Sequence, residues 1–381
     1  MTASPSTLHF FVPGALDQRT GGYLYDARMV RGLEALAWPV VVHELPGRWP
    51  EPESDDVETF DAQLTALAPG SLVLIDGLAG GAHPELFERH ARHLRIVALV
   101  HHPLGDETGV GEADRERLLA LEMRGLAAAA GAIVTSPFTA RRLEGLGADP
   151  ARVRVVIPGT EPAVRAPATP AHTPSLTPGR VPEAWPRSDG SVRLLSVGNV
   201  TPRKGHDLLV EALADVADRP WHCIVAGSLE RAPEFVRQVQ HRVEHLGLTA
   251  RIDFAGELDD ATLTGLLESA DVFVLPSWYE GYGMALTEAL QHGLPVISTT
   301  GGAIADTVPA AAGRLVTPGD ARVLSAALAE VLDSPGTRQA MAAAARQHAA
   351  ALPNWSQQVA QFAGALTNLA ADRTTSEGLN G

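Results

Sequence analysis

Short apolar runs alternate with helical patterns along almost the whole chain. The runs lie at 8–12, 40–43, 72–75, 96–100, 132–135 and 153–157, and then at 193–197, 223–226, 252–255, 272–275, 296–298 and 314–316. Strands that alternate strictly with helices form right-handed βαβ units and therefore parallel sheets. A chain of 381 residues is longer than one hydrophobic core usually supports. The sequence therefore predicts an α/β protein with two doubly wound, Rossmann-like domains.

Prolines mark the boundary between the two domains. The alternation stops between residues 161 and 190, where prolines stand at positions 162, 167, 170, 174, 178, 182 and 186. Proline disrupts helix interiors and lacks a backbone donor, so such a segment is extended and exposed. We expect an N-terminal domain at 1–165, a linker at 166–190, a C-terminal domain at 191–352, and a segment at 353–381 with a last helix and a frayed tail.

Composition argues against several partners. The net charge of −15 opposes binding to nucleic acid and to anionic membrane surfaces. No window reaches the roughly 18 apolar residues of a membrane span, and the first residues lack the pattern of a secretion signal. Cys223 has no second cysteine to pair with, as is common in the cytoplasm. We expect a cytoplasmic protein without nucleic-acid partners or stable membrane association; its oligomeric state stays open.

The stretch 271–297 predicts an anion site. Its apolar run ends at Pro276, a glycine-bearing turn follows, and a helical pattern begins near Gly283. Glu280 is therefore expected at the carboxyl end of a strand, where the amides of the next helix attract anions. Glu288 lies roughly 7 to 8 Å along that helix from its start. Two carboxylates on either side of an anion site suit a nucleoside diphosphate sugar.

A pair of adjacent cations supports the same interpretation. Arg203 and Lys204 lie in the loop after the run at 193–197, before a helix expected from about His206. Arginine offers a planar fork to phosphate oxygens and lysine a point charge. Because this loop follows a strand of the same sheet as Glu280, we expect both cations to bind diphosphate rather than to be solvated turn residues.

The spacing Glu280-x7-Glu288, with Gly281 and Gly283 inside it and a Gly-x-Pro-Val run at 293–296, resembles the signature of retaining glycosyltransferases of family 4. The resemblance implies the GT-B fold, in which two Rossmann-like domains face each other across a cleft and the last helix returns to the first domain. It also implies transfer of a sugar from a nucleoside diphosphate sugar to an acceptor, which the acidic balance suggests is small and soluble.

The resemblance assigns roles to individual residues. Glu288 is expected to bind the ribose, Glu280 the hydroxyls of the transferred sugar, and His101 the anomeric side. The expected catalytic residues are His101, Glu280 and Lys204. The expected donor-binding residues are Gly21, Gly22, Asn199, Arg203, Lys204, Gly283, Met284, Ala285 and Glu288. Asn199 stands where the family commonly has arginine, so either Arg203 substitutes for it or diphosphate affinity is lower.

The acceptor side is expected in the first domain. Gly21 and Gly22 lead into a helix, and paired glycines let a backbone approach a ligand closely. Tyr23 and His102 are expected to contact the acceptor. Glu107 and Glu122 are read either as further acceptor contacts or as solvated helix carboxylates.

No metal or cofactor is expected. The sequence contains no Asp-x-Asp triplet, no zinc-ligand spacing among its 14 histidines, and a single cysteine. It also lacks a Gly-x-Gly-x-x-Gly run, a P-loop and a Gly-x-Ser-x-Gly elbow. Two alternatives stay open. One is a sugar phosphorylase or nucleotide-sugar epimerase of the same fold, and the other is a degenerate nucleotide-sugar-binding subunit that supports a partner transferase, as Asn199 suggests.

Overall fold

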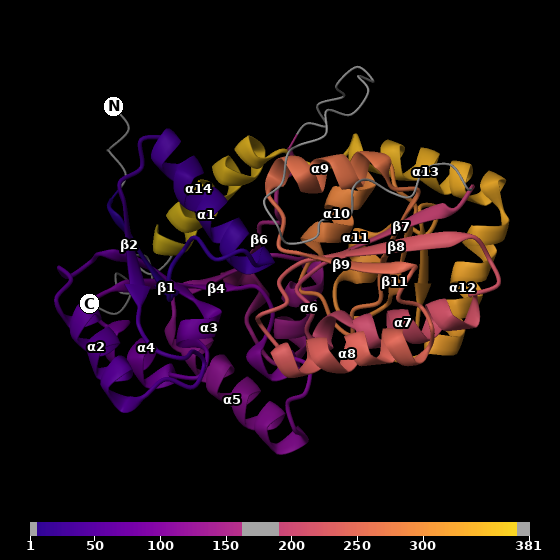
Figure 1. Ribbon diagram of the computed structural model, residues 1–381. Coiled ribbons are helices and arrows are strands. Elements are labelled where there is room, and N and C mark those ends of the chain that lie inside the picture. The colour runs from indigo at the N-terminus through magenta and orange to yellow at the C-terminus, as the bar shows by residue number, and fades with distance from the viewer. Residues whose placement is uncertain (1–5, 162–189, 372–381) are drawn as a thin grey trace. The chain divides into compact units, whose positions relative to one another are not determined.

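The computed structural model describes residues 6–161 and 190–371. The chain forms two compact units (Figure 1): the first contains Met1–Gly159 and Pro353–Gly381, and the second Thr160–Leu352. Except for Gly190, the linker predicted at 166–190 lies outside the described residues, as does the predicted tail after residue 371. Each unit is described by itself.

The first unit contains a six-stranded parallel sheet in the order β2-β1-β3-β4-β5-β6. Its strands are β1 (Leu8–Pro13), β2 (Val40–Leu45), β3 (Leu72–Asp76), β4 (Arg95–Val100), β5 (Gly131–Val134) and β6 (Val153–Val155). Its α-helices are α1 (Gly21–Ala35), α2 (Ser54–Thr65), α3 (Gly77–Gly80), α4 (Pro84–His90), α5 (Glu112–Ala128), α6 (Pro137–Gly145) and α14 (Trp355–Ala371). Short 3₁₀ turns lie at Leu104–Asp106 and Pro150–Arg152.

Helices cover both faces of this sheet, with α1 and α14 on one face and α2 to α5 on the other (Figure 1). The strands β3 and β5 are wholly buried, as expected for parallel strands between two helical layers. The last helix, α14, packs against α1, β4 and β5. Gly32 permits the close approach of α1 to α14, because a Cβ there would lie 2.3 Å from Cγ2 of Val359.

The second unit repeats this architecture in the strand order β12-β11-β10-β7-β8-β9, again with parallel pairing throughout. Its strands are β7 (Val192–Val197), β8 (Trp221–Ala226), β9 (Ile252–Gly256), β10 (Val272–Leu275), β11 (Val296–Thr299) and β12 (Gly313–Val316). Its α-helices are α7 (His206–Asp215), α8 (Pro233–His245), α9 (Asp260–Ser269), α10 (Met284–Gln291), α11 (Ile304–Thr307), α12 (Ala321–Asp333) and α13 (Pro335–Ala349). A 3₁₀ turn at Pro202–Lys204 precedes α7.

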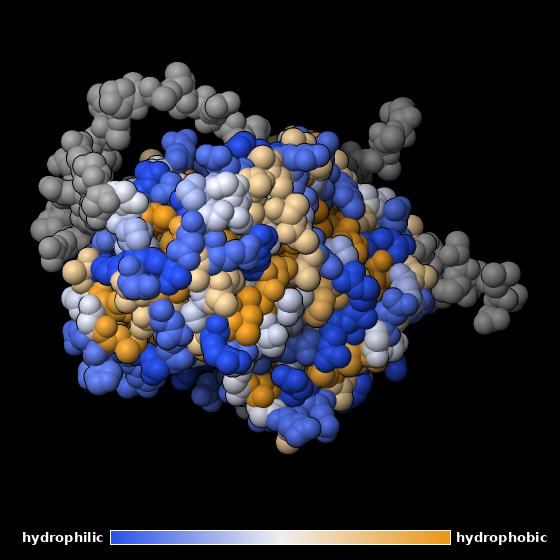
Figure 2. All heavy atoms as spheres, turned by 90° about the vertical axis from the view of Figure 1, so that its right-hand side faces the viewer, coloured by the Kyte–Doolittle hydropathy of each residue, from blue (hydrophilic) through white to orange (hydrophobic). Residues whose placement is uncertain are grey.

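Two apolar clusters fill the faces of the second sheet. One cluster joins it to α7, α8 and α12, and the other to α9, α10, α11 and α13. Cys223 is buried in the first cluster. On the face shown in Figure 2, apolar residues form small groups separated by hydrophilic ones, which is usual for a globular surface. No helix within residues 6–161 and 190–371 has both the length and the apolar character needed to cross a bilayer.

The predicted α/β class and the two parallel sheets are confirmed. In the first sheet β1 lies between β2 and β3, and in the second sheet β7 lies between β8 and β10, so the chain order reverses beside β1 in one unit and beside β7 in the other. Ligands of doubly wound sheets bind at such reversal points, next to the carboxyl ends of the strands. A ligand-binding site is therefore expected at the loops after β1, β3, β4, β7 and β10.

Candidate functional site

Glu280 follows β10 beside the reversal point of the second sheet, and its side chain is buried, with 6% of the residue exposed. Its Oε1 accepts hydrogen bonds from Lys204 Nζ at 2.6 Å and from Ser277 Oγ at 2.6 Å. Its Oε2 accepts one from Arg203 Nη1 at 3.3 Å. The structure thus brings together three residues that the sequence predicted for one site, and adds Ser277.

The charge of Glu280 is set by these neighbours. Burial alone would raise the pKa of its carboxyl, but Lys204 and Arg203, together with the hydrogen bond from Ser277, outweigh burial and lower the pKa to about 2. Glu280 is therefore ionised at neutral pH. This carboxylate is available as an acceptor for sugar hydroxyls or as a counter-ion for the two cations.

Backbone contacts fix the loops that carry these side chains. Gly205 has a left-handed φ of 66°, and a Cβ there would lie 2.3 Å from the carbonyl oxygen of Pro276, so only glycine fits this close approach. The amide of Trp278 donates to the carbonyl of Arg203 at 2.8 Å. Arg203 Nη1 in turn donates to the carbonyl of Tyr279 at 2.8 Å. The loops after β7 and β10 therefore form one connected platform.

The helix α10 begins directly beside this platform. Gly283 precedes it with a left-handed φ of 95°, and the amide of Leu286 donates the first hydrogen bond back to the Gly283 carbonyl, at 2.9 Å. The amides of Met284 and Ala285 come before that bond, in the helix turn that attracts anions. Glu288 lies one turn further on; burial and then the charge of Asp260 raise its pKa. The anion site at these amides and the binding role of Glu288 stay predictions.

Asn199 has a structural contact that the sequence did not reveal. Its Oδ1 accepts a hydrogen bond from the amide of Ser228 at 3.1 Å, which ties the loop after β7 to the loop after β8. The side chain is neutral and its amide nitrogen is a donor only. The platform therefore carries two cations, Arg203 and Lys204, with Asn199 as a neutral neighbour.

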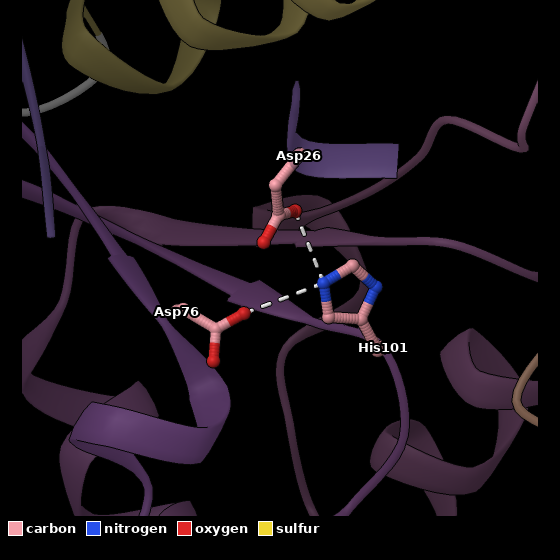
Figure 3. Close-up of side chains that lie close together, drawn as sticks. All are labelled: Asp26, Asp76 and His101. Atoms are coloured by element: carbon pink, nitrogen blue, oxygen red, sulfur yellow. Dashed lines mark hydrogen bonds and ion pairs between the residues drawn. The ribbon is translucent and has the colours of Figure 1, made fainter. Parts of the chain in front are cut away.

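In the first unit, His101 lies after β4 and contacts two carboxylates. Its Nε2 lies 3.1 Å from Asp26 Oδ1 and 3.3 Å from Asp76 Oδ2 (Figure 3). The side chains of Asp26 and Asp76 are 2% and 6% exposed, and that of His101 is 22% exposed. The three residues come from α1, the end of β3 and the end of β4, so the first unit also has a polar cluster beside its reversal point.

These groups change one another's affinity for protons. Burial lowers the pKa of His101, but the charges of Asp26 and Asp76 and their hydrogen bonds to it outweigh burial and raise the pKa to about 10. Burial raises the pKa of Asp26 to about 6, against the opposing effect of His101. The cluster thus contains an imidazole that favours its protonated form.

Asp26 and Asp76 were not predicted as site residues, although the sequence carries a signal for each. Asp26 falls on the helical face of α1 that also carries Met29, Val30 and Leu33, all of which are buried. An aspartate on an apolar helix face is expensive to bury without a partner. Asp76 ends a strand whose other residues are all apolar and buried, which places it at the ligand-binding edge of the sheet.

The atoms of this cluster are also close enough to hold a metal ion. One ligand atom from each of Asp26, Asp76 and His101 lies within 4.8 Å of the other two, and among the described residues this is the group with such spacing. The hydrogen bonds to Nε2 account for the same arrangement without an ion. Metal independence stays a prediction.

The remaining predicted residues of the first unit lie around this cluster or next to it in sequence. Gly21 and Gly22 open α1, and a Cβ on Gly22 would lie 3.4 Å from His101 Cδ2. The hydroxyl of Tyr23 donates to the carbonyl of Pro13. His102 Nε2 lies 3.1 Å from Glu107 Oε2. The structure brings Gly22 to His101, while the acceptor roles of Tyr23 and His102 stay predictions.

Glu122 corrects one interpretation. It is not a solvated helix carboxylate, because it is buried and its Oε2 accepts a hydrogen bond from the amide of Leu104 at 3.1 Å. Within the described residues its Oε1 is buried without a hydrogen-bond partner. Burial, despite the bond from Leu104, raises the pKa of Glu122 to about 8, so the side chain is largely protonated at neutral pH.

This leads to a stability prediction for Glu122→Gln. A carboxyl whose pKa is raised on folding favours the folded state less as pH rises from its unfolded pKa, about 4.5, through its folded pKa, about 8. Glu122→Gln should remove that part of the pH dependence and be more stable than the original protein at pH 9, by on the order of 1–3 kcal/mol. Urea unfolding at pH 5, 7 and 9 measures this. Glu116→Gln, at an exposed position on the same helix, is the control; equal pH profiles for all three proteins would contradict the prediction.

Comparison with known proteins connects these clusters to a family. The family of group 1 glycosyl transferases matches residues 180–348. This range includes Arg203, Lys204 and Glu280. A D-inositol 3-phosphate glycosyltransferase of Geodermatophilus obscurus is 30% identical over 281 residues, 71% of this chain and 56% of that protein. A GDP-mannose-dependent monoacylated alpha-(1-6)-phosphatidylinositol monomannoside mannosyltransferase of Corynebacterium glutamicum is 34% identical over 164 residues, 41% of this chain and 42% of that protein. These alignments thus span 42% and 56% of the two relatives.

Solved structures show the same fold over nearly the whole chain. A sucrose-phosphate synthase of Thermosynechococcus elongatus matches with a TM-score of 0.77 at 22% identity, over 96% of this chain and 100% of that chain. HepE of Anabaena, solved with UDP and glucose, matches with a TM-score of 0.70 at 17% identity, over 95% of this chain and 99% of that chain. The predicted GT-B fold is therefore confirmed. With the motif spacing, these matches identify residues 180–348 as a group 1 glycosyl transferase domain and support a GT4-type glycosyltransferase with the GT-B fold.

Proposed function

We propose that this protein transfers a sugar from a nucleoside diphosphate sugar to a small acceptor, with retention at the anomeric carbon and without a metal ion. The observation that carries the proposal is the ionised, buried Glu280 held by Lys204 and Arg203 beside the amino end of α10. A diphosphate and a polyol need this combination, because the cations and helix amides suit phosphate oxygens and the carboxylate suits hydroxyls.

The composition of the chain adds weight to Lys204. The sequence has 30 lysine and arginine residues, of which Lys204 is the only lysine and the other 30 − 1 = 29 are arginines. Apart from the histidines, every other basic side chain in the sequence is an arginine. Lysine differs from arginine in presenting a compact point charge with three donors. The single lysine lies 2.6 Å from the site carboxylate, as expected for a position where the chemistry requires an ammonium group.

In this mechanism the second unit stabilises the leaving group. Departure of the diphosphate develops negative charge on its oxygens, and Lys204, Arg203 and the amides of Met284 and Ala285 are fixed in place to receive it. Lys204 donates a hydrogen bond to Glu280, and its ammonium group has three N–H donors in all. Same-face attack lets the leaving phosphate accept the proton of the acceptor hydroxyl, so no separate base is needed.

Nucleoside diphosphate binding tests the proposal directly. A ligand that binds only the folded protein at 100 times its Kd adds about 2.7 kcal/mol of stability, so one of GDP, UDP or ADP should raise the melting temperature measurably. The shift should persist in excess EDTA and shrink in Lys204→Met. The matching sugar nucleotide is then tested for transfer with anomer-resolved product analysis. No shift with any of the three nucleotides would contradict the proposal.

Asn199 favours one alternative. Its side chain is neutral and bound to the Ser228 amide, where the family commonly supplies a cation, so a nucleotide-sugar-binding subunit without turnover is the second candidate. Tight nucleotide binding without transfer to any acceptor would favour that candidate. Conversion of the sugar nucleotide without an acceptor would point instead to an epimerase, and sugar phosphate formation to a phosphorylase.

A further inference from the structure

The Nε2 atom of His101 serves two buried carboxylates at once. It lies 3.1 Å from Asp26 Oδ1 and 3.3 Å from Asp76 Oδ2. Asp76 is also fixed from its other side, because its Oδ1 accepts a hydrogen bond from the amide of Leu78 at 2.7 Å. Ionised carboxylates are acceptors only, so Nε2 must carry the proton in this arrangement.

We propose that Asp26 and Asp76 are positioning residues that hold His101 as a fixed imidazolium, whose Nδ1–H is a charged hydrogen-bond donor to oxygen atoms of the substrate. The charge state of His101 is independent of the proposed function. The use of Nδ1–H toward a substrate rests on that function.

Local charge supports the protonated form. Within the described residues, the hydrogen bonds and ion pairs of Asp26 and Asp76 involve no lysine or arginine. The other titratable group against the imidazole is Tyr25, whose ring lies at 86° to it with the ring centroids 5.6 Å apart. Tyr25 is neutral, because burial raises its pKa well above the usual value, and its hydroxyl donates to the carbonyl of Val156. His101 is therefore the counter-charge for both aspartates, and a neutral imidazole would leave two buried carboxylates uncompensated.

The geometry leaves the other ring nitrogen turned away from the carboxylates. In Figure 3, Nδ1 points away from both aspartates, and no hydrogen bond joins it to any part of the chain that the structure describes. The side chain of His101 is 22% exposed. Gly22 lies against the ring and presents only backbone to it; a Cβ at this position would lie 3.4 Å from His101 Cδ2. In the imidazolium both ring nitrogens are donors, so Nδ1–H is the group that a ligand would meet.

This arrangement separates two roles for His101. A general base must be neutral near the working pH and therefore needs a pKa close to 7. Two carboxylates on Nε2 raise the pKa of His101 to about 10, which favours a donor over a base. A cationic donor stabilises developing negative charge or orients a sugar oxygen, which agrees with a mechanism in which the leaving phosphate takes the acceptor proton.

The first test is an NMR titration of the full-length protein with ring-labelled histidine, in which the His101 signal is identified by its loss in His101→Gln. In the unchanged protein His101 should stay protonated beyond pH 8, above the ordinary histidine pKa of about 6.5. Asp26→Asn and Asp76→Asn should each lower the pKa of His101 by more than about 1 unit. Asp61→Asn is the matched control, because Asp61 pairs with His90 at 2.6 Å in the same unit, and it should leave His101 unchanged.

Three outcomes would overturn the proposal. His101 could titrate near 6.5 in the unchanged protein, a result that does not depend on whether the variants fold. The aspartate variants could fold, as judged by circular dichroism, without moving its pKa. Micromolar Mn²⁺ or Zn²⁺ could displace the proton and selectively broaden or shift the His101 signal, which would assign the three side chains to a cation.

The second test is the pH profile of transfer. The unchanged protein should show no loss of kcat from deprotonation of His101 between pH 6 and 8. In Asp76→Asn, kcat should fall as pH rises through the lowered pKa of His101. In His101→Gln, kcat should be low at every pH and should show no such fall. A raised His101 pKa without transfer of any sugar would reject the proposed function and leave the charge assignment standing. Normal sugar transfer by a protein whose His101 has an ordinary pKa would support the proposed function and reject the charge assignment.

Discussion

Lys204→Met is expected to lower kcat/KM for sugar transfer by about 10²–10³-fold, the usual effect of removing one preorganised group that stabilises developing charge. The reason is its position: Nζ lies 2.6 Å from the site carboxylate, and the next cation, Arg203, is bound to the Tyr279 carbonyl. Steady-state kinetics with the sugar nucleotide that passes the binding test measures the loss. Most of it should fall on kcat, because the diphosphate gains charge in the transition state.

Because the sequence contains one lysine, the same question has a chemical answer. Acylation of primary amines modifies Lys204 and the chain's α-amino group, and it should inactivate the protein to the level of Lys204→Met. Bound nucleoside diphosphate should protect against inactivation. Lys204→Arg keeps the charge but has no ε-amino group, so acylation should leave its residual activity unchanged. Full activity after stoichiometric modification of Lys204 would remove the assigned role.

The sequence predicted the fold because its signals are local. Strands buried on both faces read as continuous apolar runs, and the restart of that pattern after the prolines separates the two sheets. Glu280, Lys204 and Arg203 were found for the same reason: each lies directly after such a run. Strand ends in a parallel sheet share one edge, so their neighbourhood follows from topology.

What the sequence did not show depends on side-chain direction and on neighbours distant in sequence. Asp26 is 75 residues from His101, and its inward orientation depends on the packing of α1 onto the sheet. The sequence left Glu122 as either an acceptor contact or a solvated helix carboxylate, yet it occupies the buried face of α5. In the sequence Asn199 stands where a cation is expected. Its hydrogen bond with the amide of Ser228 could not be predicted, because it depends on the contact between the loops after β7 and β8.

The largest stability effect is expected when one member of the buried ion pair is removed. Among the described residues, Lys204→Met leaves Arg203, at 3.3 Å, as the one cationic partner of the buried Glu280. Breaking a buried pair from one side costs about 3–5 kcal/mol, and the remaining arginine places this case near the lower limit. Glu280→Gln in the same chain removes the uncompensated charge, so the double variant should recover most of that loss. Urea unfolding of the two single variants and the double variant gives the coupling energy.

The pH dependence gives an independent reading of the same pair. The pKa of Glu280 is lowered to about 2 from an ordinary value of 4.5. Its contribution to stability is therefore present above about pH 4.5 and is lost as pH falls toward 2. Glu280→Gln should lose less stability than the unchanged protein between pH 5 and 3, and Glu330→Gln, which removes an exposed carboxylate paired with Arg314, serves as the surface control. Strictly additive effects of the two substitutions, with parallel acid profiles, would mean that Lys204 and Glu280 are not coupled, and the ionised carboxylate on which the proposed site depends would lose its physical basis.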